Sequence, residues 1–166
     1  LTARPPVHLR DYHIAAPLSN DYRDGVLDVR AWISNASNED RTVAVWATLR
    51  DAQGEQTLRE RVGEALVAAG ADAEVSASWP VSKPRQWTAE TPALYELTLE
   101  LIDVDGSVLE GHATRVGFRT VELRNGQLYI NNVPVLLFGV NRHDHDPYAG
   151  KAVPREAMLK DILLMK

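Results

Sequence analysis

The sequence predicts an all-β fold: an immunoglobulin-like β-sandwich, followed by a short βα segment that begins a truncated (β/α)8 barrel. Two observations predict the sandwich. Residues 7–119 read as short segments in which apolar and polar residues alternate, and turn residues separate these segments about every 10 to 20 positions. A third observation predicts the barrel segment, because after Arg119 a continuous apolar run and then helical spacing replace the alternation.

The expected strands of the sandwich follow one another in chain order. Apolar residues occupy every second position from Leu27 to Ile33 and from Val43 to Leu49, and side chains in a strand alternate between its two faces. The same alternation is clearest from Tyr95 to Leu101, after which Asp105-Gly106 turns the chain. About seven strands result, the number typical of an immunoglobulin-like sandwich. They cover residues 7–15, 27–33, 43–49, 56–66, 73–79, 95–101 and 107–118.

A hairpin is predicted next. Asn125-Gly126 and Asn131-Asn132 are tight-turn signals on either side of residues 127–130. We therefore expect the sandwich domain to span residues 1–120 and a second domain to begin with this hairpin at residue 121.

Residues 121–166 are expected to hold the hairpin, the first strand and the first helix of a truncated TIM-barrel domain. Residues 133–140 form a continuous apolar run, which is typical of a parallel strand covered on both faces. Pro154 suits the first turn of a helix, and apolar residues at helical spacing follow it. One such unit cannot close a barrel that requires eight.

Composition excludes several classes of function. The chain is 45% hydrophobic and 25% charged with a formal net charge of -5, and it has no basic cluster with interleaved aromatic residues, so nucleic acid is not expected as a partner. It has no cysteine, which excludes a disulfide or a thiol nucleophile and suits a reducing compartment, so we expect a cytoplasmic protein. No apolar run approaches the roughly 20 residues that span a bilayer, so a membrane is not expected as a partner either.

The densest polar cluster follows the apolar run. It reads Asn141-Arg142-His143-Asp144-His145-Asp146-Pro147 and lies at the carboxyl end of the expected strand, where barrels build their active sites. One or two of these side chains would then face a pocket. The alternative is a solvated loop that its Asp and Pro residues simply turn.

Two sharper interpretations of the same loop remain open. His143 and His145 would share one face if the strand continued, as metal-ligating pairs do, although two ligands do not complete a metal site. Asp144 and Asp146 could be a catalytic carboxylate pair, but two residues on one short loop seldom flank a substrate from opposite sides. We expect both aspartates to support or cap the loop.

The four tryptophans are expected to pack rather than to bind a ligand, although an indole face also suits a sugar ring. Trp79 continues the inward alternation of its strand, and Trp87 lies in a segment, residues 84–88, that resembles a crossover stapling the sandwich. Trp32 and Trp46 fall on the opposite faces of their strands and are expected to face a neighbouring domain.

Five motifs stand in order along the second half of the chain: Gln86 to Leu97, Arg115 to Arg119, Ile130-Asn131, Gly139 to His143 and Asp161 to Lys166. Together they resemble the bacterial β-galactosidases of glycoside hydrolase family 2. The likeness is specific over residues 84–166 and looser before them, where Asp11-Tyr12-His13-Ile14 is the best local match. Phe138 departs from the family, whose members usually carry Arg there.

The resemblance implies a multidomain enzyme that hydrolyses terminal β-D-galactosides with retention, using one Glu as nucleophile and another as acid/base. Both glutamates would lie downstream of Lys166, so no catalytic residue is expected in this chain. His143 is the one substrate-binding residue that the resemblance places here, as a hydrogen-bond partner of galactose hydroxyls. No cofactor is implied for this part of the family's chain, whose Mg²⁺ and Na⁺ ions bind elsewhere.

Expected partners are the carbohydrate substrate and further copies of the chain. Residues 135–138 need cover on both faces and hydrogen-bond partners along their edges, so we expect the tail to self-associate and the protein to be a homo-oligomer. The rival hypothesis is a free-standing carbohydrate-binding or adhesion sandwich. Such a module should end near its last strand, whereas this chain continues well beyond it.

Overall fold

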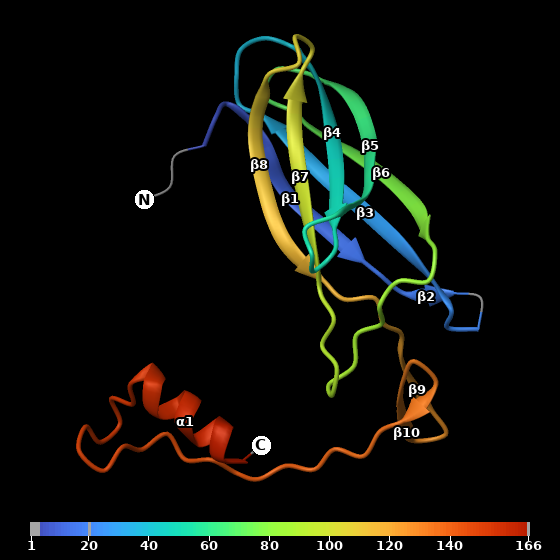
Figure 1. Cartoon of the computed structure of the whole chain (residues 1–166). Helices are drawn as coiled ribbons and strands as arrows, with labels where there is room; N and C mark the ends of the chain where they lie inside the picture. The colour runs from blue at the N-terminus through green and yellow to red at the C-terminus, as the bar shows by residue number, and fades with distance from the viewer. Residues whose placement is uncertain (1–3, 20, 166) are drawn as a thin grey trace. The chain divides into compact units, whose positions relative to one another are not determined.

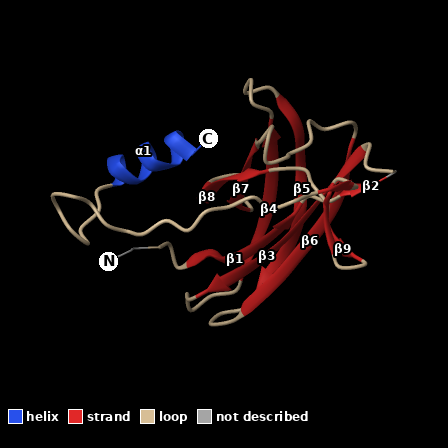
Figure 2. Cartoon of the chain, turned by 90° about the horizontal axis from the view of Figure 1, so that it is seen from below, coloured by secondary structure: helices blue, strands red, loops and turns tan. Residues whose placement is uncertain are grey.

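The computed structural model describes residues 4–19 and 21–165, which fall into two compact units (Figure 1). The first unit is Leu1–Val135 and the second is Leu136–Lys166. Strands, drawn red in Figure 2, make up most of the first unit, and the helix α1 lies in the second. The described part of the chain holds no helix with the length and apolar character that crossing a bilayer requires.

Two antiparallel sheets form the sandwich, as predicted. In one sheet β3 lies between β6 on one edge and, on the other edge, β1 followed by the two-residue β2. The other sheet has the order β5-β4-β7-β8. The strands are β1 (Val7–Ala15), β2 (Leu18–Ser19), β3 (Asp24–Asn35), β4 (Arg41–Arg50), β5 (Gln56–Val67), β6 (Asp72–Val81), β7 (Tyr95–Asp103) and β8 (Val108–Val116). All seven predicted strands are confirmed, whereas β2 was not predicted.

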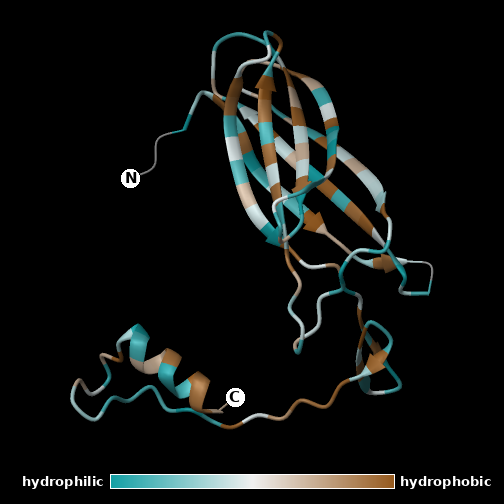
Figure 3. Cartoon of the chain, viewed as in Figure 1, coloured by the Kyte–Doolittle hydropathy of each residue, from teal (hydrophilic) through white to brown (hydrophobic). Residues whose placement is uncertain are grey.

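The core lies between the inner faces of the two sheets. Hydrophobic and hydrophilic bands alternate along the strands in Figure 3, as expected for strands that are covered on one side only. The alternating residues of β3, β4 and β7 are buried, and Phe118 closes one end by packing edge-on against Tyr95, with ring centroids 5.2 Å apart. The fully buried side chains include Leu9, Leu27, Val29, Ile33, Val43, Val45, Leu49, Val67, Leu97, Leu99, Leu101 and Phe118.

Trp79 and Trp87 pack as predicted. Trp79 is partly buried against the core. Trp87 is half-buried, and the Arg119 guanidinium lies 4.3 Å from its ring centroid. Trp32 and Trp46 lie on outer faces beneath Arg30 and Arg59, at 6.0 Å and 5.7 Å.

The predicted hairpin is confirmed as β9 (Val121–Arg124) and β10 (Gln127–Ile130), with the two-residue β11 (Val133–Pro134) added to its other edge. Asn125 and Gly126 have φ values of 50° and 76°, and Asn131 and Asn132 have values of 50° and 66°. Positive φ at both central residues is what a tight hairpin turn of this handedness requires, and Asn and Gly tolerate it best.

Only the start of the run of residues 133–140, where a barrel strand is expected, is paired in this structure. Only Val133–Pro134 pairs with another strand, and residues 135–145 have no strand structure. A parallel barrel strand takes its hydrogen bonds from parallel neighbours, and the described residues offer it none.

The predicted helix is confirmed as α1 (Arg155–Met165). The carbonyl oxygen of Pro154 accepts hydrogen bonds from the backbone N–H groups of Ala157 and Met158, so Pro154 stands at the start of the first turn. None of the helix residues is buried in the described chain.

Candidate functional site

The candidate site is the loop that follows the apolar run, residues 141–147, in the second compact unit. It lies between an extended segment and the turn that leads to α1. The polar cluster singled out from the sequence is therefore in a loop, and its side chains differ sharply in how they are held.

Arg142 ties this loop to the helix. Its Nε donates a 2.8 Å hydrogen bond to Oδ2 of Asp161 in α1, and its Nη1 is paired with Asp144. The hydrogen bond that Arg142 donates to Asp161 is the largest cause that raises the pKa of Arg142, the bond to Asp144 also raises it, and desolvation acts in the opposite direction. The guanidinium is thus held by two carboxylates, and its Nη2 is buried without a hydrogen-bond partner among the described residues.

Asp146 shapes the end of the loop. Its Oδ1 accepts 2.8 Å hydrogen bonds from the backbone N–H groups of Tyr148 and Ala149, and its own backbone pairs with Gly150 in both directions. The bonds from Ala149 and then Tyr148 lower the pKa of the Asp146 carboxyl group. Asp146 is therefore a turn-capping residue, as expected.

His143 and His145 are exposed, and the backbone N–H of His145 donates to the carbonyl oxygen of His143 at 2.9 Å. Neither imidazole ring has a hydrogen-bond partner within the described chain. The geometric premise of a metal pair is not met, because residues 143–145 do not continue a strand that would turn both rings to one face. No group of three or more His, Cys, Asp or Glu side chains gathers to hold a metal among the residues the structure describes.

Sequence reasoning missed the role of Asp161. This residue was noticed as part of a motif, but its pairing with Arg142 spans 19 positions and two different elements. One signal could have found it: Asp161 directly precedes the apolar residues Ile162 to Met165 of α1, and a carboxylate at the edge of such a run needs a cationic partner when the helix packs.

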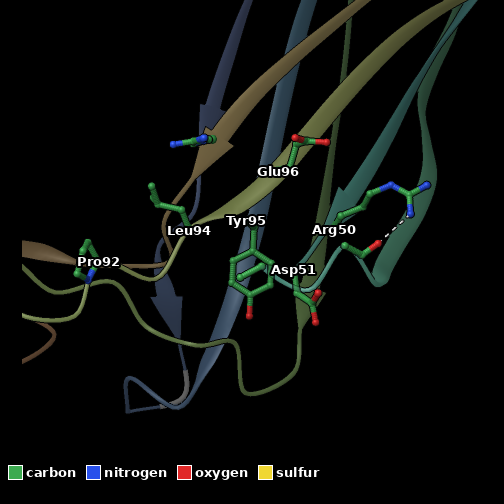
Figure 4. Close-up of a pocket in the computed structure, with 9 residues that line it drawn as sticks. Arg50, Asp51, Pro92, Leu94, Tyr95 and Glu96 are labelled. Atoms are coloured by element: carbon green, nitrogen blue, oxygen red, sulfur yellow. Dashed lines mark hydrogen bonds between the residues drawn. The ribbon is translucent and has the colours of Figure 1, made fainter.

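Apart from this loop, a pocket of about 440 Å3 lies at one end of the sandwich (Figure 4). Arg50, Glu96 and Arg115 face it from adjacent positions on β4, β7 and β8. Arg50 also donates a 3.1 Å hydrogen bond to the carbonyl oxygen of Gly54, the dashed line of Figure 4. Glu96 lies between two guanidiniums in this row, which has neither a nucleophile beside a base nor a pair of carboxylates for acid–base work.

Comparisons with known proteins agree along the whole chain. The family model described as glycosyl hydrolases family 2 matches residues 7–119, and the model of the same family's TIM barrel domain matches residues 121–166. A protein named beta-galactosidase from Aeromonas hydrophila is 41% identical over 170 residues, and one of the same name from Priestia megaterium is 38% identical over 168 residues. Each alignment covers 100% of this chain and 16% of the relative, so the chain spans about a sixth of the length of these proteins.

Solved structures share the fold. A beta-glucuronidase from Bacteroides uniformis superposes with a TM-score of 0.81 at 24% identity, covering 98% of this chain and 20% of that one. A glycosyl hydrolase family 2 member from Bacteroides cellulosilyticus superposes with a TM-score of 0.83 at 18% identity, covering 98% of this chain and 22% of that one. The chain therefore shares its fold with a part of each of these larger proteins.

Proposed function

Because this chain belongs to glycosyl hydrolases family 2, we propose that the protein containing it hydrolyses terminal β-D-galactosides with retention of configuration. One observation supports galactose above other sugars: proteins named beta-galactosidase are 36% to 41% identical to this chain over its entire length. In this proposal two glutamates from barrel segments after Lys166 act as nucleophile and acid/base. Residues 1–166 contribute neither of them.

We assign this part of the protein a supporting role. Residues 1–120 would be a noncatalytic sandwich that positions the barrel, and residues 121–166 would be the barrel's hairpin, first strand and first helix. The loop of residues 141–147 would then lie at the carboxyl end of a barrel strand, the end at which such enzymes bind substrate. His143 would hydrogen-bond the sugar hydroxyls, which suits an exposed imidazole that no described residue engages.

The charges of the loop suit a neutral sugar. Arg142 is the loop's sole Lys or Arg, and both Asp161 and Asp144 already hold its guanidinium. A sugar that carries a carboxylate requires a free cationic partner, because a buried unpaired charge is costly. This loop offers none from its own residues, which supports a galactoside.

The matched TIM barrel domain counts against a free-standing carbohydrate-binding module. Residues 121–166 belong to that domain by family, and a module that only binds glycans has no use for the start of a barrel. Calorimetric titration of residues 1–120 with galactosides should accordingly show no binding. Saturable heat at millimolar ligand would favour the binding module.

The test of the proposed function is expression of the gene that encodes this chain, to its natural stop codon. The purified protein should hydrolyse an aryl β-galactoside much faster than the matching β-glucuronide, and proton NMR should show the β-anomer of galactose as the first product. Residues 1–166 alone should hydrolyse neither. Preference for the glucuronide, or release of the α-anomer first, would contradict the proposal.

We further propose that the protein is a cytoplasmic homo-oligomer and that this chain by itself self-associates through its tail. Residues 136–140 and the helix carry large exposed apolar side chains, among them Leu137, Phe138 and Leu164. Light scattering should therefore report a larger mass for the chain than its 18.4 kDa, and a monomer for a version that ends at Val135. A monomeric mass for both would contradict tail association, and fractionation of the source cells would test the location.

A further inference from the structure

The hairpin of β9 and β10 meets the sandwich through Asn131, one of three buried polar residues in the described chain. Its side-chain Oδ1 accepts a 3.0 Å hydrogen bond from the backbone N–H of Thr120, and its Nδ2 donates a 3.1 Å hydrogen bond to the carbonyl oxygen of Trp87. Its backbone N–H donates to the carbonyl oxygen of Thr120 at 2.9 Å. One side-chain amide thus joins the end of the hairpin to two other segments of the chain.

Trp87 is itself held in place. Its backbone N–H donates to the carbonyl oxygen of Phe118 at 2.9 Å, and Arg119 covers its ring. The fit is close, because a Cβ added at Gly117 would come within 2.9 Å of the Cβ of Trp87. The partner of Asn131 is therefore a fixed part of the sandwich.

Residues 16–19 and Tyr22 complete the joint. The backbone N–H of Arg119 donates to the carbonyl oxygen of Ala16 at 3.0 Å, and that of Leu18 donates to Oγ1 of Thr120 at 2.9 Å. Tyr22 then reaches the hairpin itself, where its hydroxyl donates to Oε2 of Glu122. This carboxylate is the main cause that raises the pKa of Tyr22, so the phenol stays protonated as the donor.

The next residue shows what is special about Asn131. Asn132 has the same residue type and a similar positive φ, 66° against 50°. Its side chain, however, is exposed and accepts a hydrogen bond only from Arg124 of the same hairpin. Turn geometry therefore accounts for an Asn at both positions, whereas the contacts to the sandwich belong to Asn131 alone.

The chain that leaves the hairpin is tied to it as far as Val135. The backbone N–H of Val135 donates to the carbonyl oxygen of Leu128 at 2.9 Å, and Nε2 of Gln127 donates to the carbonyl oxygen of Val135 at 2.9 Å. The sandwich, the hairpin and the first residues of the apolar run thus belong to one compact unit.

We infer that Asn131 is a positioning residue, which locks the hairpin to the sandwich and so sets the place and direction from which the chain enters the barrel. This inference rests on the proposed function, because it concerns the strand that would carry His143 to the substrate. A displacement of about 1 Å in a catalytic arrangement can cost a hundredfold in rate. Loss of the Asn131 contacts should therefore lower the catalytic rate at an active site that Asn131 does not contact.

The lock is tested in this chain with two matched variants, Asn131→Gly and Asn132→Gly. Glycine keeps the positive φ at both positions, so neither change strains the turn. Asn131→Gly should speed amide exchange at Thr120 and Leu128 by about tenfold, as the loss of ordinary buried hydrogen bonds predicts, while the core strands β3 and β4 exchange as before. Asn132→Gly should leave all these amides unchanged. Equal exchange in the two variants would overturn the lock.

The positioning role is tested in the longer enzyme with the same two variants. Active sites are counted with a covalent glycosidase inactivator, so that turnover is expressed per folded site. Asn131→Gly should lower kcat at least about tenfold at a temperature far below unfolding, with the thermal unfolding of the sandwich shifted little, whereas Asn132→Gly should keep wild-type turnover. A lower melting temperature with unchanged turnover per site would show a structural role only and would overturn the inference.

The two proposals fail in different ways. If the wild-type enzyme hydrolyses no glycoside, the proposed function is wrong, and the amide exchange of the matched variants still decides whether the lock exists. If the wild-type enzyme is active and Asn131→Gly matches it in kcat per site, the proposed function stands and the positioning role is wrong.

Discussion

The sandwich and the barrel-start segment, residues 136–166, both contain large apolar side chains, but the sandwich buries them and the barrel-start segment exposes them. In the sandwich, large apolar side chains such as Leu49 and Leu99 are completely buried. In the barrel-start segment, Leu137 and Phe138 are 83% and 91% exposed, and α1 has no buried residue within the described chain. The difference lies in the partners and not in the composition of the two regions.

This contrast follows from how each architecture hides an apolar face. The sandwich is closed within the chain, because each of its two sheets supplies the cover for the other. A barrel strand needs parallel neighbours on both edges and helices outside it, and eight repeated units supply them. Residues 136–166 contain one such unit, so their apolar surface stays open while the sandwich is complete.

The largest expected effect is on the core of the sandwich. Leu99→Ala should lower the free energy of unfolding by about 2 to 5 kcal/mol, because it removes buried methyl groups and leaves a cavity. Leu163→Ala, at a position in α1 that is 64% exposed, should change it by less than about 0.5 kcal/mol. Urea titration followed by tryptophan fluorescence measures both. If Leu163→Ala lowers the free energy of unfolding as much as Leu99→Ala does, the contrast between the two regions is wrong.

The second effect concerns function in the longer enzyme. If His143 contacts the sugar chiefly in the transition state, His143→Ala should lower kcat and kcat/KM together. The expected loss corresponds to a rise of about 2 to 4 kcal/mol in the activation free energy. His145→Ala is the matched control, because it removes another exposed imidazole from the same loop. Near wild-type kinetics for His143→Ala would indicate that His143 belongs to a solvated loop and does not contact the sugar.

A smaller effect tests how tightly the sandwich is packed. A Cβ added at Gly25 would lie 2.5 Å from the Phe118 ring and 2.9 Å from Pro84, so Gly25→Ala should cost about 1 to 3 kcal/mol of stability. The control is Gly111→Ala, where the nearest atom is the carbonyl oxygen of Leu99 at 4.0 Å. Thermal unfolding should show a lower melting temperature for Gly25→Ala than for Gly111→Ala. Equal melting temperatures would show that the core around Phe118 can rearrange to accept the added methyl group.

The smallest effect is on pH response, for which one turn-capping aspartate of each region is compared. Hydrogen bonds from Ser107 lower the pKa of Asp105 in the sandwich, and bonds from Ala149 and Tyr148 lower that of Asp146. A carboxyl group with a lowered folded pKa stabilises its turn above the unfolded pKa of about 3.9, and this contribution is lost as the pH falls through the folded pKa.

The two turns should then respond differently to acid. The ladder between β7 and β8 holds the Asp105 turn whatever its charge, whereas backbone bonds between Asp146 and Gly150 are the main remaining support of the other turn. As the pH falls below about 4, NMR should show the amides of residues 146–150 lose their dispersion before any change near Asp105. Loss of both turns at one pH would show that the ladder gives no such protection.

Local patterns sufficed to predict most of the fold. Alternation placed the strands of the sandwich, and Asn-Gly and Asn-Asn placed the two tight turns of the hairpin, because both signals act over two to four neighbouring residues. The same reasoning missed β2, and it missed the positive φ values of Asp21 and Tyr22, 54° and 63°. No residue type there demands that conformation, so the surrounding structure imposes it.

The candidate site was predictable only in part. The loop of residues 141–147 stood out by its polarity and by its place after an apolar run, and the turn-capping role of Asp146 follows from its residue type. The pairing of Arg142 with Asp161 could not be read along the chain, because the two residues meet only once the loop folds back onto α1.

The sequence by itself determined the seven long strands of the sandwich, the tight turns of the hairpin and the polarity of the loop at residues 141–147, since local sterics and the period of two decide the strands and turns. Tertiary structure alone decided which of two adjacent asparagines binds the sandwich. Asn131 meets Trp87 across 44 positions of the chain, and Asn132 does not. Contacts between distant segments depend on how the sheets pack, and no local pattern encodes that packing.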